Sequence, residues 1–291
     1  MTALIFGASG QTGHYLARLL AARGERCVAV SRATHGPAGD IRDAGAVRQL
    51  VAATQPDLVF HLAARSATAH LHLAENRATI VDGAIHVLEA CRQHAPGARV
   101  FLAGSGLVFA NHGAPLRATD AFAPTSAYAL ARIEAVYVAR YYRSLGHQVW
   151  LGHLFHHESP RRGKEHVAMR IAQAARAIGT GAAGKLRLGD PLVEKEWTHA
   201  EDVARAILAF VSQDQVHETC IASGLARPIA AWAEACFAHH GLDWRDHVEA
   251  TPGFVPEYRR LVGDPTEIRA LGWQPQVSFA ELAHEVMEAL A

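Results

Sequence analysis

Short apolar runs alternate with helical patterns of apolar residues over the first half of the chain. The runs predict strands, and apolar positions spaced by three or four residues predict helices between them. The expected strands cover residues 2–7, 26–31, 57–64, 98–106 and 148–155, and the expected helices cover residues 12–24, 43–55, 73–95 and 126–146. This rhythm favours a parallel sheet covered by helices on both faces. It predicts an α/β fold with a Rossmann-type doubly wound sheet.

The pattern changes after about residue 156. Proline, glycine and charged residues gather at 157–165 and 179–191, and helical stretches follow at 200–212, 228–241, 264–271 and 278–290. The apolar run at 219–223 is short enough to return to the sheet. We expect two domains. Residues 1–155 with 199–223 form the sheet domain, and residues 156–198 with 224–291 form a smaller, mostly helical substrate domain.

Composition narrows the class of protein. The 291 residues contain 28 Lys and Arg against 28 Asp and Glu, which gives no reason to expect nucleic acid or an anionic membrane as a partner. No apolar window approaches the length of about 18 residues that a membrane span needs. The four cysteines are scattered without a CxxC pair, which indicates a reducing compartment. We expect a cytoplasmic, soluble protein.

The 19 histidines raise the question of a metal site. The densest group, HLFHHESP at 153–160, lacks the HExxH spacing, and no cysteine lies near it to complete a tetrahedral site. Surface and partly buried histidines are the simpler interpretation. The sequence predicts no metal.

A glycine-rich turn follows the first expected strand. In GASGQTG, Gly7, Gly10 and Gly13 are spaced by three residues and open the first helix, with Gln11 and Thr12 between them. Small residues let the backbone approach a pyrophosphate, and the helix N-terminus supplies N–H donors. A plain tight turn is the alternative, but the strand–turn–helix context favours a dinucleotide site.

The end of the second expected strand decides between NAD and NADP. NAD-binding proteins of this type usually place an acid there, about 20 residues after the glycine turn, to hold the ribose 2′-hydroxyl. This chain has Val30-Ser31-Arg32 instead. Because Arg32 is suited to a 2′-phosphate, we expect NADP as the cofactor, with NAD less favoured. A solvated loop arginine is the alternative interpretation of Arg32.

A tyrosine and an arginine share one face of the helix at 126–146. Tyr128 precedes Arg132 by four residues, so their side chains are neighbours. A tyrosine beside a fixed positive charge is suited to give and take a proton. Ser105, at the end of an expected strand, offers a second hydroxyl. Packing is the usual role of such a tyrosine, but its combination with Ser105 and the glycine turn favours catalysis.

Several motifs together resemble the extended short-chain dehydrogenase/reductases, and within them GDP-mannose 4,6-dehydratase and its relatives. The segments that carry the resemblance are the glycine turn, GDIRD (39–43), HLAA (61–64), AGSGLVF (103–109), Tyr128, LFHHESPRRG (154–163), EWTHAEDV (196–203), CIASG (220–224) and LVGDPTEIRALGW (261–273). They span essentially the whole chain, and HESPRRG is the most specific of them. The resemblance implies an NAD(P) domain, a nucleotide-sugar domain and a homodimer formed through the helices at 73–95 and 126–146.

The resemblance also implies roles for individual residues. Ser105 and Tyr128 would act at the C4 oxygen of the sugar, and Arg132 would hold the nicotinamide ribose. The cofactor would be bound by Gly7, Gly10, Gln11, Thr12, Gly13, Arg32, Asp40, Ile41, Leu62, Ala63, Ala64, Tyr128, Arg132, Leu154, His157 and Arg161. The nucleotide sugar, expected to be GDP-linked, would be bound by Ser105, His156, Arg170, Lys195 and Glu257.

The chain departs from that family pattern at four positions. Arg132 stands where the family has a lysine; it keeps the charge but cannot release a proton. Leu107 stands where the dehydratase has a glutamate that removes the C5 proton, and leucine cannot act as a base. His156 replaces an asparagine of the sugar site, and Val255 an arginine.

The pattern from Ser105 to Phe109 resembles that of the GDP-4-keto-6-deoxy-mannose reductases instead. We therefore expect an NADP-dependent reductase acting at C4 of a GDP-linked sugar. A 4,6-dehydratase with another base is the alternative enzyme. A non-catalytic NADP-binding sensor or scaffold is the alternative from another class.

Overall fold

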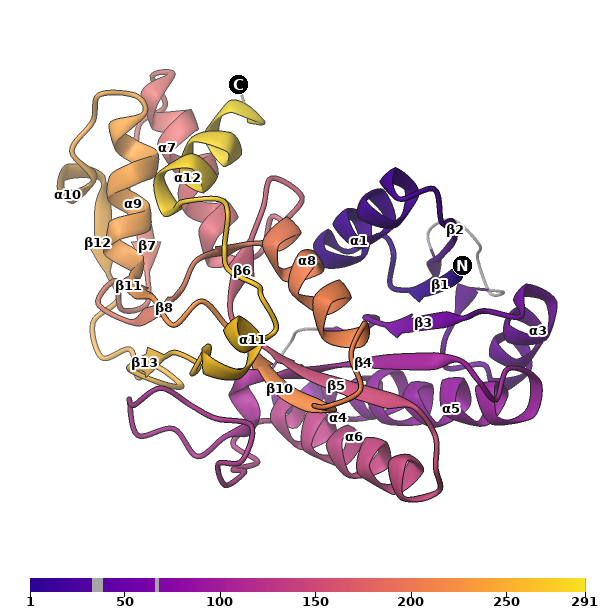
Figure 1. The fold of residues 1–291 in the computed structure, drawn as a ribbon. Helices are drawn as coiled ribbons and strands as arrows, with labels where there is room; N and C mark the ends of the chain where they lie inside the picture. The colour runs from indigo at the N-terminus through magenta and orange to yellow at the C-terminus, as the bar shows by residue number, and fades with distance from the viewer. Residues whose placement is uncertain (33–38, 66–67, 291) are drawn as a thin grey trace.

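The computed structural model describes residues 1–32, 39–65 and 68–290, and its centre is a six-stranded parallel sheet (Figure 1). The strands follow the order β10-β5-β4-β3-β1-β2 across the sheet. Their bounds are Thr2–Phe6 (β1), Arg26–Val30 (β2), Leu58–His61 (β3), Arg99–Ser105 (β4), Val149–Leu154 (β5) and Glu218–Ile221 (β10). Each expected strand is present, and the run at 219–223 does return to the sheet as β10. The predicted Rossmann-type doubly wound fold is confirmed.

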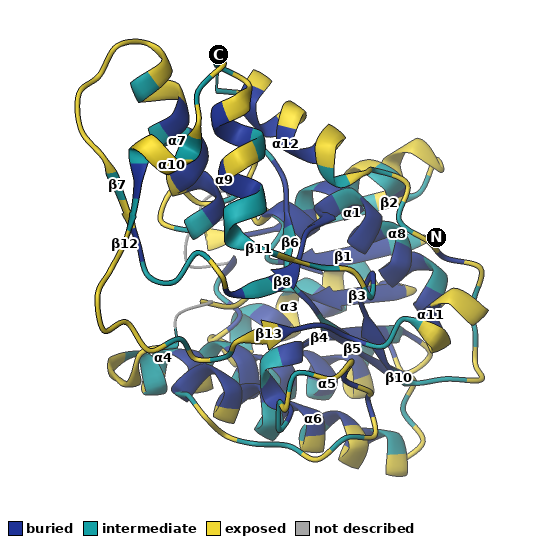
Figure 2. Ribbon diagram, turned by 90° about the vertical axis from the view of Figure 1, so that its left-hand side faces the viewer, coloured by how far each residue is buried: buried dark blue, intermediate teal, exposed yellow. Residues whose placement is uncertain are grey.

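Helices cover both faces of this sheet. Figure 1 shows α1 and α8 on one side and α5 and α6 on the other. Their bounds are Gln11–Ala22 (α1), Ala44–Thr54 (α3), Gly83–His94 (α5), Ala127–Ser144 (α6) and Ala200–Val211 (α8). Strand β1 shows why both faces are needed: Ile5 packs into the core beneath α1 and α8, whereas Leu4 and Phe6 pack into the core with α3 and α5. Both faces of the sheet are therefore apolar and buried (Figure 2).

The strand order places a topological switch point between β1 and β3. The chain leaves β1 toward β2 at one edge and leaves β3 toward β4 and β5 on the other side. In open α/β sheets, ligands bind beyond the carboxyl ends of the strands at such a point. Phe6, His61, Ser105 and Leu154 all end their strands at this edge.

The helix expected at 73–95 is interrupted. Helix α4 (Leu73–Asn76) passes into a π-helical turn at Arg77–Asp82 before α5 begins. A π turn widens the helix by one residue and commonly occurs near a functional site. After it, Gly83 packs against Ile41 and His61, where an added Cβ would lie 3.2 Å from the Ile41 side chain.

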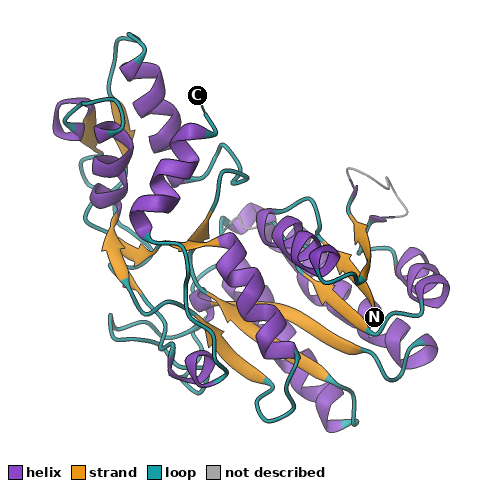
Figure 3. Ribbon diagram, turned by 45° about the horizontal axis from the view of Figure 1, so that its top comes forward, coloured by secondary structure: helices purple, strands orange, loops and turns teal. Residues whose placement is uncertain are grey.

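The C-terminal lobe packs three main helices with short strands (Figure 3). The helices are α7 (Val167–Gly179), α9 (Ile229–Ala238) and α12 (Phe279–Glu288), with the shorter α10 (Trp244–His247) and α11 (Thr266–Ala270). The strands are β6 (His157–Glu158), β7 (Leu186–Leu188), β8 (Glu194–Glu196), β9 (Thr198–His199), β11 (Ala226–Pro228), β12 (Val248–Ala250) and β13 (Arg260–Leu261). Trp197 and Trp232 stack at the centre of this core, with ring centroids 4.8 Å apart.

These short strands pair outside the central sheet and were not expected from the sequence. Runs of two or three residues are too short to show a periodic pattern. Across the described ranges, no helix is long and apolar enough to cross a membrane.

A buried carboxylate joins three segments near the start of the C-terminal lobe. Glu196, fully buried in β8, accepts hydrogen bonds from the backbone N–H groups of Ser223, Gly224 and Gly263 and from the Ser223 hydroxyl. Burial raises the pKa of Glu196, and these donors oppose that effect. One side chain thus fixes the ends of β10 and β13 against β8.

The Glu196→Gln variant should lower the free energy of unfolding by about 2–3 kcal/mol, because the new amide NH₂ faces N–H donors that then have no acceptor. Urea unfolding, monitored by circular dichroism, measures this free energy. The control is Glu194→Gln in the same strand, whose side chain is 42% exposed and pairs with Arg260. Glu194→Gln should lower the free energy of unfolding by less than about 1 kcal/mol. Equal midpoints for the two variants would contradict the structural role of Glu196.

Candidate active site

The glycine turn brings backbone segments into close contact. Gly7 has φ +87°, and a Cβ on it would lie 2.6 Å from the backbone nitrogen of Ala63. A Cβ on Gly13 would lie 2.5 Å from the carbonyl oxygen of Gly7. Both positions therefore require glycine. This contact brings the end of β1, the start of α1 and the end of β3 together.

The N-terminus of α1 is open to an anion. Gly10 is its N-cap and provides no side-chain hydrogen bond to the first turn, which also contains no acidic residue. The first N–H groups of α1 thus point out of the turn with a partial positive charge. These features fit the pyrophosphate of a dinucleotide.

Two adjoining cavities follow the carboxyl edge of the sheet from this turn. The first has a volume of about 840 Å³ and the second about 510 Å³; Gly7, Gly10, Leu62 and Ala64 line both. The first also contains the expected residues Arg32, Asp40, Ile41 and Ala63. The second contains the expected residues Gln11, Thr12, Gly13, Ser105, Tyr128, Arg132, Leu154, His156, His157 and Arg161. Residues distant in the chain thus line one continuous trough.

The first cavity is lined by the basic side chain of Arg32, just after β2, and by the acidic side chain of Asp40 further along the chain. Asp40 forms a two-point ion pair with Arg42, and this arginine lowers the pKa of Asp40; Arg32 contributes to the same effect from nearby. Arg32 itself is exposed at the cavity wall. No acid follows β2 at Ser31 or Arg32, as noted from the sequence.

Tyr128 and Arg132 form the centre of the second cavity. Ser126 caps α6 by accepting from the N–H of Ala129, which fixes the first turn that carries Tyr128. Arg132 Nε donates to the Tyr128 hydroxyl at 3.1 Å, and Arg132 Nη1 donates to the carbonyl oxygen of Ala103 in β4. A donor aimed at the phenol oxygen stabilises negative charge that develops there.

Ser105 lies at the end of β4 beside this pair. Its Oγ accepts from the N–H of Leu107 at 3.2 Å, and its side chain is buried. The hydroxyl proton is thus left to donate into the cavity. Leu107 itself lines the cavity, and among the described residues that line it, none is an aspartate or glutamate.

Hydrogen bonds join the segment after β5 to the start of α1. His157 Nδ1 lies 2.8 Å from the carbonyl oxygen of Phe155, so it donates, and His157 Nε2 accepts from the Thr12 hydroxyl at 2.9 Å. Burial, followed by Arg162, lowers the pKa of His157 to about 4. Gln11 adds two more bonds, to the carbonyl oxygen of His157 and from the hydroxyl of Ser159.

A buried carboxylate lies among basic side chains behind the cavity wall. Glu158 Oε1 is 2.9 Å from His156 Nε2, and Glu158 Oε2 is 3.4 Å from Arg162 Nε. Burial raises the pKa of Glu158, but Arg162, His156 and Lys195 together lower it to about 2. Burial lowers the pKa of Lys195 to about 8, which Glu158 opposes.

Three expected sugar-site residues do not line either cavity. Arg170 donates to the carbonyl oxygen of Arg187 on the surface, and Lys195 lies over the Trp197 ring at 5.1 Å. Glu257 is exposed; partial desolvation of its carboxylate raises its pKa, and a hydrogen bond with Ser126 opposes this effect. Conversely, Arg162, His166 and Tyr258 line the second cavity without having been singled out. Arg162 belongs to the HESPRRG motif, which was its only sequence signal.

The fold and this trough define a nicotinamide-dinucleotide enzyme of the short-chain dehydrogenase/reductase class. The family model for GDP-mannose 4,6 dehydratase matches residues 4–286. The chain belongs to the GDP-mannose 4,6-dehydratase family.

Individual relatives agree with this assignment, and a solved structure has the same fold. The chain is 29% identical over 319 residues to GDP-mannose 4,6 dehydratase 1 of Arabidopsis thaliana, covering 98% of this chain and 88% of the relative. It is 29% identical over 350 residues to a GDP-mannose 4,6-dehydratase of Vibrio cholerae, covering 99% and 93%. Its fold is similar to RMD from Pseudomonas aeruginosa complexed with NADPH, with a TM-score of 0.89 and 21% identity over 99% and 98% of the two chains.

Arg132→Ala should weaken binding of the nicotinamide cofactor by at least about tenfold, because it removes a buried donor and charge from the cavity. Arg132→Lys should bind the cofactor with an affinity within about tenfold of the parent's, since an ammonium keeps the charge. Fluorescence titration with NADPH and with NADH measures both, with thermal unfolding to verify that each variant is folded. Unchanged affinity in a folded Arg132→Ala variant would contradict this role.

Proposed function

We propose that the protein is an NADP-dependent enzyme that acts at C4 of the sugar in a GDP-linked hexose. The observation that carries the proposal is the 3.1 Å contact between Arg132 and Tyr128 beside Ser105. A bound nicotinamide supplies the hydride acceptor or donor. Ser105 and Tyr128 hydrogen-bond the C4 oxygen, and Tyr128 takes or returns its proton. The family and its relatives' names support a GDP-linked substrate.

The names of the relatives favour 4,6-dehydration over the 4-keto reduction that we expected from the sequence. In this reaction the C4 alcohol would lose a hydride to the nicotinamide and its O4 proton to Tyr128. The C5 proton and the C6 hydroxyl would leave as water, after which the hydride would return to C6 and a proton to C5. The cofactor is then regenerated in each turnover. We take dehydration as the first candidate reaction.

Leu107 is the observation that favours a second candidate, reduction of a 4-keto sugar. Removal of the C5 proton needs a base, and loss of such a base costs roughly 10²–10⁴ in rate. The described residues that line the second cavity offer imidazoles, at His156, His157 and His166, but no carboxylate. Reduction adds a hydride at C4 and a proton at O4, so it needs no base at C5. A non-catalytic scaffold would need neither Ser105 nor Tyr128 in this cavity.

We also propose the domain division expected from the sequence. Residues 1–155 with 199–223 bind the dinucleotide, and residues 156–198 with 224–291 bind the nucleotide sugar. Lys195 supports this division, because it stands on β8 next to the His156–Glu158 pair at the end of the second cavity.

Tyr128→Phe should lower turnover by roughly 10²–10⁴ while leaving NADPH affinity nearly unchanged, because it removes only the proton donor. Mass spectrometry identifies the reaction: GDP-mannose with catalytic NADP⁺ should lose one water, and a GDP-4-keto sugar with NADPH should gain two hydrogens. The control is Tyr137→Phe on the exposed side of the same helix, which should be fully active. A Tyr128→Phe variant as fast as the parent would exclude the proposed mechanism.

NADPH should bind more tightly than NADH, because Arg32 is available to a 2′-phosphate and no acid repels it at the end of β2. Arg32→Ala should remove most of that difference while leaving NADH affinity unchanged. Parallel fluorescence titrations of the two cofactors measure the ratio. Equal affinities for the two cofactors in the parent protein would rule out NADP preference.

We further propose a homodimer formed through α6. Leu130, Tyr137, Tyr141 and Leu145 are 36%, 58%, 60% and 53% exposed, and their spacing places them along one face of the helix. Replacing Tyr137 and Tyr141 together by glutamate should yield a monomer by light scattering at micromolar concentration. A parent protein that is itself monomeric, or a tetramer, would contradict the proposal.

A further inference from the structure

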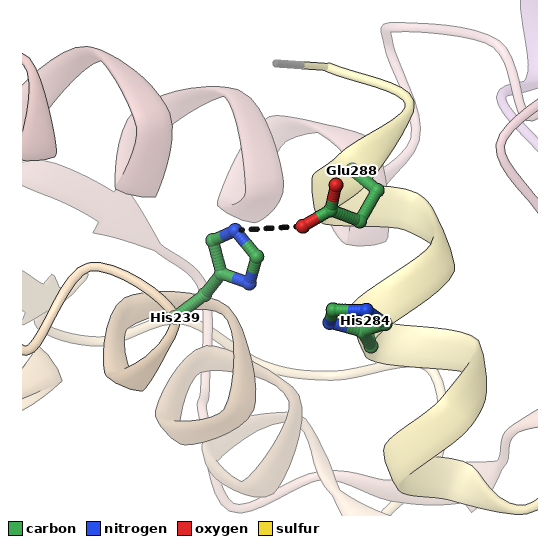
Figure 4. A group of neighbouring side chains, drawn as sticks. All are labelled: His239, His284 and Glu288. Carbon is green, nitrogen blue, oxygen red and sulfur yellow. Dashed lines mark ion pairs between the residues drawn. The ribbon is translucent and has the colours of Figure 1, made fainter.

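Two histidines and a glutamate meet on the surface of the C-terminal lobe, away from both cavities (Figure 4). His239 follows the last residue of α9, and His284 and Glu288 lie on α12. Each offers one ligand atom, and these atoms lie within 4.8 Å of one another. His239 Nε2 is 3.6 Å from Glu288 Oε1. The sequence did not predict this group, because the two histidines lie far apart in the chain.

The packing of α9 against α12 sets the positions of these side chains. Trp232 and Phe237 of α9 share a core with Leu282 and Val286 of α12. His284 and Glu288 are four residues apart, so both face the same side of α12, toward His239 (Figure 4).

The start of α12 is also fixed. Ser278 and Glu281 form a capping box, and Asp202 accepts from the N–H groups of Gln276 and Val277. The two helices therefore present the three side chains from rigid supports, so little backbone order remains to be gained when a ligand binds.

An ion pair between His239 and Glu288 accounts for only part of this arrangement. The ring of His284 lies 5.7 Å from that of His239, centroid to centroid, and within the described residues His284 makes no hydrogen bond or ion pair. Two imidazoles beside one carboxylate are the ligands that Zn²⁺ binds well, whereas Mg²⁺ and Ca²⁺ prefer oxygen alone.

The spacing is close to what a zinc ion needs. Bonds of about 2.0–2.2 Å in a tetrahedral site place ligand atoms roughly 3.3–3.5 Å apart. The present ligand atoms must therefore approach by at most about 1.5 Å from their 4.8 Å limit. All three residues are on the surface, outside the hydrophobic core of the lobe.

We propose that His239, His284 and Glu288 bind one divalent transition-metal cation, zinc in particular, with water in the fourth position. The bound ion links the last turn of α12 to the end of α9. Because the unfolded chain does not hold these three ligands together, the ion stabilises the folded state.

The test uses the full chain without a histidine tag, freed of metal with a chelator that is then removed. Isothermal titration with ZnCl₂ measures affinity and stoichiometry for the parent and for His239→Ala, His284→Ala and Glu288→Gln. Because the chain has 19 histidines, His112→Ala, an exposed histidine in a distant loop, is the matched control. Thermal unfolding with and without ZnCl₂ gives a second readout.

The parent and His112→Ala should share one Zn²⁺ site that His239→Ala and His284→Ala each weaken by at least about tenfold. Zinc should raise the melting temperature of the parent and the control but not that of the histidine variants, and MgCl₂ should have no effect. Without zinc, all four variants should have the same melting temperature as the parent. The proposal would be overturned if His284→Ala bound zinc as tightly as His112→Ala does, or if the parent bound no zinc.

Discussion

The close approach at the glycine turn is the constraint on which the rest of the site depends. Gly7 touches the backbone at Ala63, and Gly13 touches Gly7, so β1, α1 and β3 meet without side chains between them. This contact directs the N-terminus of α1 along the carboxyl edge of the sheet. Any side chain at either glycine would push α1 away from the sheet and close the space for a pyrophosphate.

A second constraint explains why an arginine serves at position 132. Its guanidinium reaches two acceptors at once, the Tyr128 hydroxyl in its own helix and the Ala103 carbonyl oxygen in β4. A lysine ammonium is a single point and does not match two acceptors with the same fixed fork. Arg132 thus braces α6 against the sheet while it holds a permanent charge beside Tyr128. That charge is permanent, because a guanidinium does not release its proton in a protein.

The sequence predicted those features that depend on local pattern. The strands of the central sheet and helices such as α1, α6 and α8 follow from apolar periodicity, and the glycine turn follows from spacing. The π turn at Arg77–Asp82 and the two- and three-residue strands did not follow, because tertiary packing selects them without a periodic signal. The same holds for the ionic group around Glu158: Lys195 reaches it from β8, and only folding brings β8 there.

That ionic group leaves positive charge behind the wall of the second cavity. Glu158 is one buried carboxylate facing Arg162 and Lys195, so its charge compensates only part of theirs. Burial lowers the pKa of the neighbouring His156 to about 4, so that imidazole adds no charge near neutral pH. A buried carboxylate with several cationic partners stays ionised and fixes their geometry, whereas the excess positive charge remains for a ligand. The pKa of Lys195, lowered by burial to about 8, places part of that excess under the control of pH. An anion close to this amine would favour its protonated form, so anion binding there and protonation of Lys195 would reinforce each other.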